Sequence, residues 1–200
     1  MSYDAMTLYE KMNTKPVINA LGPRTLLGGS QPHPDVIKVM GEAGRYYADM
    51  DELLIGSGKV ISEMIDCSSA LVTSGCAAAL VLGTAACVTG KDPEKMAQLP
   101  NMDGLKQEVV IQASQRYKYD RVVRMVGVKI ITAGKPGNTK REDLEDALND
   151  NTAAVLFPDI DAPGDILSIE DVISISHERN VPVIVDSAYR VFPTDMFRKF

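Results

Sequence analysis

The amino-acid sequence predicts an α/β protein with three layers, in which a mostly parallel sheet lies between helices on both faces. Two observations favour this class. From residue 108 onward, short apolar segments alternate with amphipathic helical segments, and the apolar segments lack a polar face, which is typical of buried parallel strands. The chain also has 200 residues, 45% of them hydrophobic, which is enough apolar material for one packed core.

The first half of the chain is predicted to be mainly helical. Pro34 suits the first turn of a helix, and Gly75 breaks an apolar segment before an alanine-rich helix. We expect an extended entry at 15–20, a loop at 21–34, helices at 34–48, 50–65 and 76–88, a short buried strand at 70–72, and a polar loop at 90–106.

The second half of the chain has a more regular alternation. We expect strands at 108–113, 128–132, 153–157 and 181–185, and helices at 119–126, 141–149 and 169–179. Thr139 and Ser168 each precede an acidic turn, so both are candidate helix N-caps. We see no internal repeat, and no linker divides the chain.

Composition and charge exclude several classes of function. The net charge of −6 does not favour a nucleic-acid partner, and the apolar runs are far too short to cross a membrane. Three cysteines without paired spacing favour a reducing, cytoplasmic location over a disulfide framework. His33 and His177 are far apart, and no Cys/His spacing indicates zinc, so we predict no metal site.

The first candidate site is the turn at Ser74, Gly75 and Cys76, between the predicted strand and the alanine-rich helix. Free backbone N–H groups at a helix N-terminus favour a phosphate, and small side chains let a ligand approach closely. The glycine spacing is neither the P-loop nor the dinucleotide pattern. The alternative is a purely structural turn, since many strand–helix connections use Ser-Gly.

The second candidate is Asp186, which directly follows the apolar segment 181–185. An aspartate at the carboxyl end of a parallel strand lies where open α/β folds bind their ligands. Its carboxylate must be solvated or paired, and a protonated pyridine nitrogen is one suitable partner. A helix N-cap and a metal ligand are the alternatives.

Together with five further segments, these motifs resemble the selenocysteine-synthase-like branch of fold-type-I pyridoxal-phosphate (PLP) enzymes. This branch includes L-seryl-tRNA(Sec) selenium transferases and D-glucosaminate-6-phosphate ammonia-lyases. The resemblance covers nearly the whole chain and rests on 18–22 (INALG), 27–30 (LGGS), 49–53 (DMDEL), 71–75 (LVTSG) and 116–120 (RYKYD).

The resemblance implies PLP as the cofactor. The phosphate of PLP would rest on the turn at 74–76, and Asp186 would keep the pyridine nitrogen protonated. Gln115 would lie beside the ring, where relatives often carry a histidine; an amide cannot act there as an acid or base. Arg24 and Arg116 are candidates for binding a substrate carboxylate or phosphate, and their alternative is an exposed surface arginine.

The resemblance also implies parts that this chain lacks. Such an enzyme holds PLP through a Schiff-base lysine, and Lys199 lies in a context that favours a surface position, so we assign no catalytic residue. We therefore expect an N-terminal arm and helix at 1–48 and a partial PLP-binding large domain at 49–200. The expected function is that of a PLP-dependent lyase or transferase acting on an amino acid or amino sugar acid.

We expect the 200 residues alone to be inactive, as an N-terminal fragment of such an enzyme. The alternative is a truncated, non-catalytic chain that serves as a binding or assembly partner. In the complete protein we expect a small amino-acid-like substrate and a homodimer or larger assembly, with the loop at 22–34 reaching across to a second copy.

Overall fold

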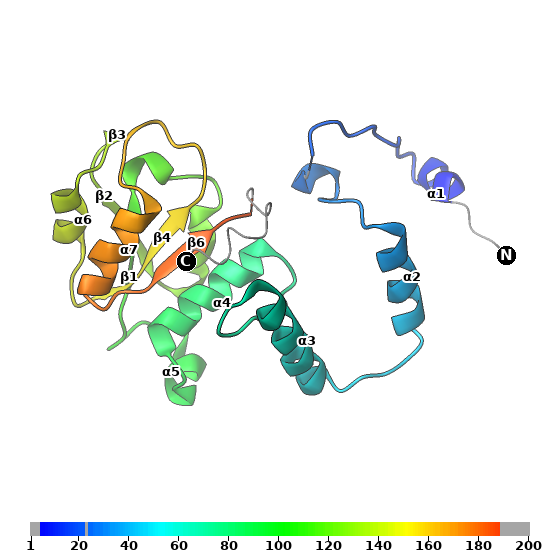
Figure 1. The fold of residues 1–200 in the computed structure, drawn as a ribbon, viewed down its shortest axis with the longest axis horizontal. Helices are drawn as coiled ribbons and strands as arrows, with labels where there is room; N and C mark the ends of the chain where they lie inside the picture. Colours follow the sequence, from blue (N-terminus) through cyan, green and yellow to red (C-terminus); the bar gives the residue numbers. More distant parts are fainter. Residues whose placement is uncertain (1–4, 23, 189–200) are drawn as a thin grey trace. The chain divides into compact units, whose positions relative to one another are not determined.

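A computed structural model describes residues 5–22 and 24–188. The chain divides into two compact units, Met1–Glu52 and Leu53–Phe200. The first unit contains α1 (Ala5–Lys11), a short 3-10 helix (Thr25–Leu27) and α2 (Pro34–Ala43), and α3 (Met50–Ile65) begins at its end (Figure 1). None of the described residues from 6 to 52 is buried, so the described part of this unit has no core of its own.

The second unit is organised around a four-stranded sheet. Its strands are β1 (Glu108–Gln112), β2 (Lys129–Ala133), β4 (Thr152–Pro158) and β6 (Val183–Asp186), in the order β2-β1-β4-β6 with every pair parallel. Two short strands, β3 (Gly137–Asn138) and β5 (Gly164–Asp165), form a separate parallel ladder that the sequence did not predict. Because all four main strands are parallel, their carboxyl ends meet at one edge.

Helices cover both faces of the sheet, and each face has its own core. On one face lie α4 (Cys76–Thr89) and a 3-10 helix at Asp120–Val126; on the other lie α6 (Arg141–Ala147) and α7 (Ile169–Glu178) (Figure 1). Successive side chains of β1 point to opposite faces, as strand geometry requires. The first core contains Leu80, Val109, Ile111, Val123 and Leu156, and the second contains Val110, Leu144, Val155, Val172 and Ile175. The predicted three-layer α/β fold is confirmed.

Most predicted elements are present, several with shifted ends. The helix at Met50–Ile65 has the expected bounds, and Ser168 caps α7 by accepting a hydrogen bond from the Asp171 amide at 3.1 Å. The helix expected at 119–126 is a 3-10 helix, and α2 ends five residues early, at Ala43. Gly41 in its last turn and Gly44 at its C-cap explain the early end, because glycine weakens a helix.

The strand predicted at 70–72 is wrong. These residues are extended but pair with no described strand, and Leu71 and Val72 are exposed. A strand needs a neighbouring backbone to accept and donate its hydrogen bonds, and the described sheet ends at β6. The segment passes close to α3 instead: a side chain at Gly58 would lie 2.3 Å from the Ala70 carbonyl oxygen, so only glycine fits there.

Two predictions based on local signals are also wrong. The loop expected at 90–106 contains a helix, α5 (Pro93–Gln98), whose N-cap is Asp92. The Asp-Pro pair at its start is a helix signal that the polar composition obscured. Thr139 does not cap α6; it is buried, and the Asp143 carboxylate accepts from the Lys140 amide at 2.8 Å in its place.

The described residues place limits on two classes of site. No helix among them is long and apolar enough to span a bilayer, and no group of three His, Cys, Asp or Glu side chains within residues 5–22 and 24–188 could hold a metal. Cys67, Cys76 and Cys87 are free thiols. The cytoplasmic location stays a prediction.

Candidate active site

Asp186 is the last residue of β6, at the carboxyl edge of the sheet. It pairs in register with Pro158 of β4, and it is buried. The sheet geometry thus holds the carboxylate at the edge where ligands bind in open α/β folds.

Three neutral groups donate hydrogen bonds to the Asp186 carboxylate. The Cys76 thiol lies 3.3 Å from Oδ1, the Ala188 amide lies 3.2 Å from the same oxygen, and the Tyr117 hydroxyl bonds Oδ2. No lysine, arginine or histidine among the described residues forms an ion pair with Asp186. A buried carboxylate without a cation is costly, so this site is suited to a cationic ligand.

The two side-chain donors keep their protons at neutral pH. Partial burial raises the pKa of the Cys76 thiol to about 11, and the Asp186 charge adds to this shift. Burial, followed by the hydrogen bond to Asp186, also raises the pKa of Tyr117. Cys76 is therefore a poor nucleophile and acts as a hydrogen-bond donor, although its place at a helix N-terminus would by itself favour the thiolate.

The turn before α4 lies next to this carboxylate. Gly75, the N-cap of α4, has φ 137° and ψ 172°, a conformation that favours glycine. The Thr73 hydroxyl donates to the Gly75 carbonyl at 3.0 Å and fixes the turn. Ser74, Gly75 and Cys76 are exposed, and the Gly75 amide donates to the Thr73 hydroxyl at 3.4 Å. The first amides of a helix have no acceptor within the helix itself. The contact between Cys76 and Asp186 brings two of the predicted site segments together.

Gln115 is fully buried beneath the same edge. Its amide nitrogen donates to the Pro158 carbonyl at 2.9 Å, and its amide oxygen accepts from Gln112 at 3.0 Å. Gln112 in turn bonds both the amide and the carbonyl of Leu167. These contacts tie the ends of β1 and β4 to the segment before α7, and a direct role of Gln115 in binding a cofactor stays a prediction.

The two arginines predicted to bind substrate lie in different units. Arg116 forms an ion pair with Asp120, and its guanidinium also donates to the Thr132 hydroxyl at 3.2 Å. Arg24 lies in the first unit, on a tight loop closed by a backbone bridge to Gly29, and is exposed. Both substrate roles stay predictions, and Lys199 lies outside the described residues.

Tyr117 is the site residue that sequence reasoning missed. Its hydroxyl contacts Asp186 across 69 positions of sequence, which no local pattern encodes. The available signal was the segment Arg116–Asp120, where aromatic and charged residues crowd together just after a strand end.

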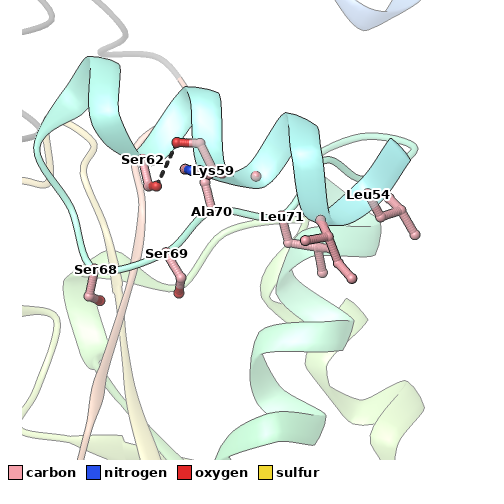
Figure 2. A pocket seen from close by; sticks show the side chains of 9 residues that line it. Leu54, Lys59, Ser62, Ser68, Ser69, Ala70 and Leu71 are labelled. Carbon is pink, nitrogen blue, oxygen red and sulfur yellow. Dashed lines mark hydrogen bonds between the residues drawn. The ribbon is translucent and has the colours of Figure 1, made fainter. Parts of the chain in front are cut away.

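A separate groove of about 380 Å³ lies between α3 and the segment 68–71 (Figure 2). Its lining mixes apolar side chains with serine hydroxyls and one lysine, Lys59, whose backbone carbonyl accepts from the Ser62 hydroxyl at 2.9 Å. None of the predicted site residues lines this groove, so it is distinct from the site at Asp186.

Comparison with known proteins supports the resemblance seen in the sequence. D-glucosaminate-6-phosphate ammonia lyase from Salmonella typhimurium is 29% identical over 187 residues, covering 90% of this chain and 51% of the relative. L-seryl-tRNA(Sec) selenium transferase from Nautilia profundicola is 26% identical over 183 residues, covering 82% of this chain and 38% of the relative. The chain therefore spans about half the length, or less, of these curated relatives. No protein-family model matches it.

Solved structures agree with the sequence relatives. The structure of a D-glucosaminate-6-phosphate ammonia-lyase superposes with a TM-score of 0.84 at 28% identity, over 92% of this chain and 51% of the other. Aspartate aminotransferase from Thermotoga maritima shares the fold, with a TM-score of 0.54 at 18% identity over 90% of this chain and 48% of the other. The resemblance to the N-terminal part of fold-type-I enzymes of the selenocysteine-synthase-like branch is confirmed, and these relatives and neighbours are PLP-dependent enzymes.

Proposed function

We propose that this chain supplies the ring-nitrogen and phosphate contacts for PLP in a lyase or transferase that acts on an amino acid or amino sugar acid. Residues 49–200 would be its part of the PLP-binding large domain. The substrate class follows from the names of the relatives, which act on D-glucosaminate-6-phosphate and on a seryl group carried by tRNA.

One observation carries this proposal: a buried carboxylate that has no cationic partner among the described residues lies one side chain away from an exposed helix N-terminus. The described donors to Asp186 are all neutral, and one of these, Cys76, is the first residue of α4. A ligand with a protonated ring nitrogen at one end and a phosphate at the other satisfies both features. The residues present therefore fit PLP.

Each site residue would make one kind of contact with the cofactor. The amides at Ser74, Gly75 and Cys76 would bind the phosphate, and Asp186 would hold the proton on the ring nitrogen. The bound cofactor supplies an electron sink for a carbanion at the substrate. The small side chains at the start of α4 leave room for the ligand to approach the backbone.

We assign no described lysine as the anchor of the cofactor. Lys118 is the lysine closest in sequence to Tyr117, and its ammonium lies 4.6 Å from the centre of the Tyr119 ring. Borohydride reduction of the purified chain mixed with PLP should therefore label no single lysine stoichiometrically. One stoichiometric adduct would contradict this assignment and identify the anchoring lysine.

The proposed function is tested by titrating the purified protein with PLP and with pyridoxal, which lacks the phosphate, using calorimetry. We expect PLP to bind and pyridoxal to bind far more weakly, because only PLP engages the α4 turn. Asp186→Asn should weaken PLP binding by roughly 30-fold, since an amide cannot pair with the pyridinium. Asp150→Asn, an exposed loop position, is the matched control and should bind like wild type.

Two outcomes would overturn the proposal. If PLP binds no more tightly than pyridoxal, the turn before α4 does not bind the phosphate. If Asp186→Asn binds PLP with wild-type affinity, Asp186 does not contact the ring nitrogen.

We also propose that the complete protein forms a homodimer or a larger assembly through its first unit. Between residues 6 and 52 the structure exposes apolar side chains, among them Ile18, Leu26 and Tyr47, at 95% or more. A segment without its own core gains stability only by packing on another surface. Sedimentation of the complete protein should give at least a dimer, and Leu26→Glu should weaken it; a monomeric wild type would refute this.

A further inference from the structure

The Tyr117 hydroxyl bonds one of the two carboxylate oxygens of Asp186 in the candidate site. Tyr117 lies between the two 3-10 helices that follow β1, and it is half-buried. Its hydroxyl is the donor that the structure gives to Oδ2 of Asp186, whereas Oδ1 receives both the Cys76 thiol and the Ala188 amide.

A carboxylate offers about four acceptor positions on its two oxygens. Described donors use three of them on Asp186, which leaves one position open within the part of the chain that the structure describes. Donors on both oxygens also fix the rotation of the carboxylate plane. The direction of the remaining acceptor position therefore depends on Tyr117, because no other described group bonds Oδ2.

Tyr117 is itself held in place from two sides. Its backbone amide donates to Oδ2 of Asp120 at 3.3 Å, and Asp120 is paired with Arg116. Its ring meets the ring of Tyr119 edge to face, with centroids 6.0 Å apart and an interplanar angle of 71°. The position of Tyr117 thus depends on the Arg116–Asp120 ion pair and on the Tyr119 ring.

We propose that Tyr117 is a positioning residue, which turns Asp186 toward the ring nitrogen of the cofactor and sets how strongly this carboxylate holds the nitrogen's proton. The proposal rests on the proposed function, because it needs a pyridine ring at Asp186. A hydrogen bond donated to the carboxylate makes it less basic. With PLP bound, Asp186 would then leave the shared proton on the ring nitrogen, which is the form in which the cofactor would supply an electron sink.

The experiment uses the full chain and PLP labelled with ¹⁵N in its ring. Tyr117→Phe removes only the hydroxyl and should weaken PLP binding by about tenfold, because the Asp186 carboxylate is then no longer held in one orientation before the ligand binds. It should also move the ¹⁵N chemical shift toward that of an unprotonated ring, because the more basic carboxylate draws the shared proton. Tyr9→Phe, at an exposed position in α1, is the matched control and should change neither value.

A second variant covers the case in which Tyr117→Phe does not fold. Placing 3-fluorotyrosine at position 117 keeps the ring and strengthens the donor, so the ¹⁵N shift should move in the opposite direction. Weaker binding without any change of the ¹⁵N shift would mean that Tyr117 is only structural, and it would overturn the inference. Wild-type values in Tyr117→Phe would do the same.

The same measurements separate this inference from the proposed function. If wild type binds no PLP, both the proposed function and the inference about Tyr117 are wrong. If wild type binds PLP and Asp186→Asn does not, but Tyr117→Phe matches wild type, then the inference alone fails.

Discussion

Two buried aspartates lie near the carboxyl edge of the sheet, and they differ in their partners. Asp120 is 4% exposed and pairs with the Arg116 guanidinium, whereas Asp186 is 8% exposed and receives only neutral donors among the described residues. Their burial is nearly the same, so solvent does not explain the difference. We infer that Asp120 stabilises the fold and that Asp186 has its charge kept available for a ligand.

Tyr117 links the two aspartates. Its amide bonds Asp120, and its hydroxyl bonds Asp186. The ion pair of the first aspartate therefore supports the geometry of the second. Functional sites often retain a charge that costs stability, and the residues around them compensate for that cost.

The largest expected effect on stability comes from Asp120. Asp120→Asn should lower the free energy of unfolding by about 2 kcal/mol, because it weakens a charge-assisted bond to Arg116 and the bond to the Tyr117 amide. This loss of unfolding free energy is small for a buried ion pair, because the Arg116 side chain is 40% exposed and solvent weakens its attraction to Asp120. Urea denaturation measures the change.

Asp186→Asn tests the stability contribution of the second aspartate. It removes a buried charge that has no cationic partner among the described residues, so the free energy of unfolding without ligand should change by less than about 1 kcal/mol or rise. Asp150→Asn again serves as the exposed control. A loss for Asp186→Asn as large as that for Asp120→Asn would mean that both carboxylates are structural, and the comparison would fail.

A smaller effect of Asp186→Asn is expected on the reactivity of the Cys76 thiol. Its raised pKa, about 11, means that the folded protein keeps the thiol protonated over the range in which an ordinary thiol ionises. Burial is the first cause and Asp186 the second, so Asp186→Asn should lower the pKa part of the way. Alkylation of Cys76 by iodoacetamide at pH 9 should then become several-fold faster.

The exposed Cys67 gives an internal control in the same alkylation experiment, because it does not contact Asp186. Its rate should be the same in wild type and in Asp186→Asn. If the two cysteines gain reactivity together, the variant has loosened the fold; if neither does, the contact between Cys76 and Asp186 does not control the thiol.

The predictions from local patterns held where neighbouring residues decide the structure. Amphipathic spacing located the helix at Met50–Ile65, and the acidic turn after Ser168 located the start of α7. The apolar segment at 70–72 has the composition of a strand but no described strand beside it, so the pattern failed there. A strand depends on a partner that its own residues do not encode.

The sequence by itself determined the α/β fold, the turn at Ser74–Cys76 and the aspartate at the end of β6, because each follows from short-range periodicity and turn chemistry. Only the tertiary structure decided that Cys76 and Tyr117 meet at Asp186, that Gln115 is buried under the edge, and that Arg116 is paired with Asp120. These contacts join residues from separate strands and helices. Their geometry depends on how the layers pack, which no local pattern specifies.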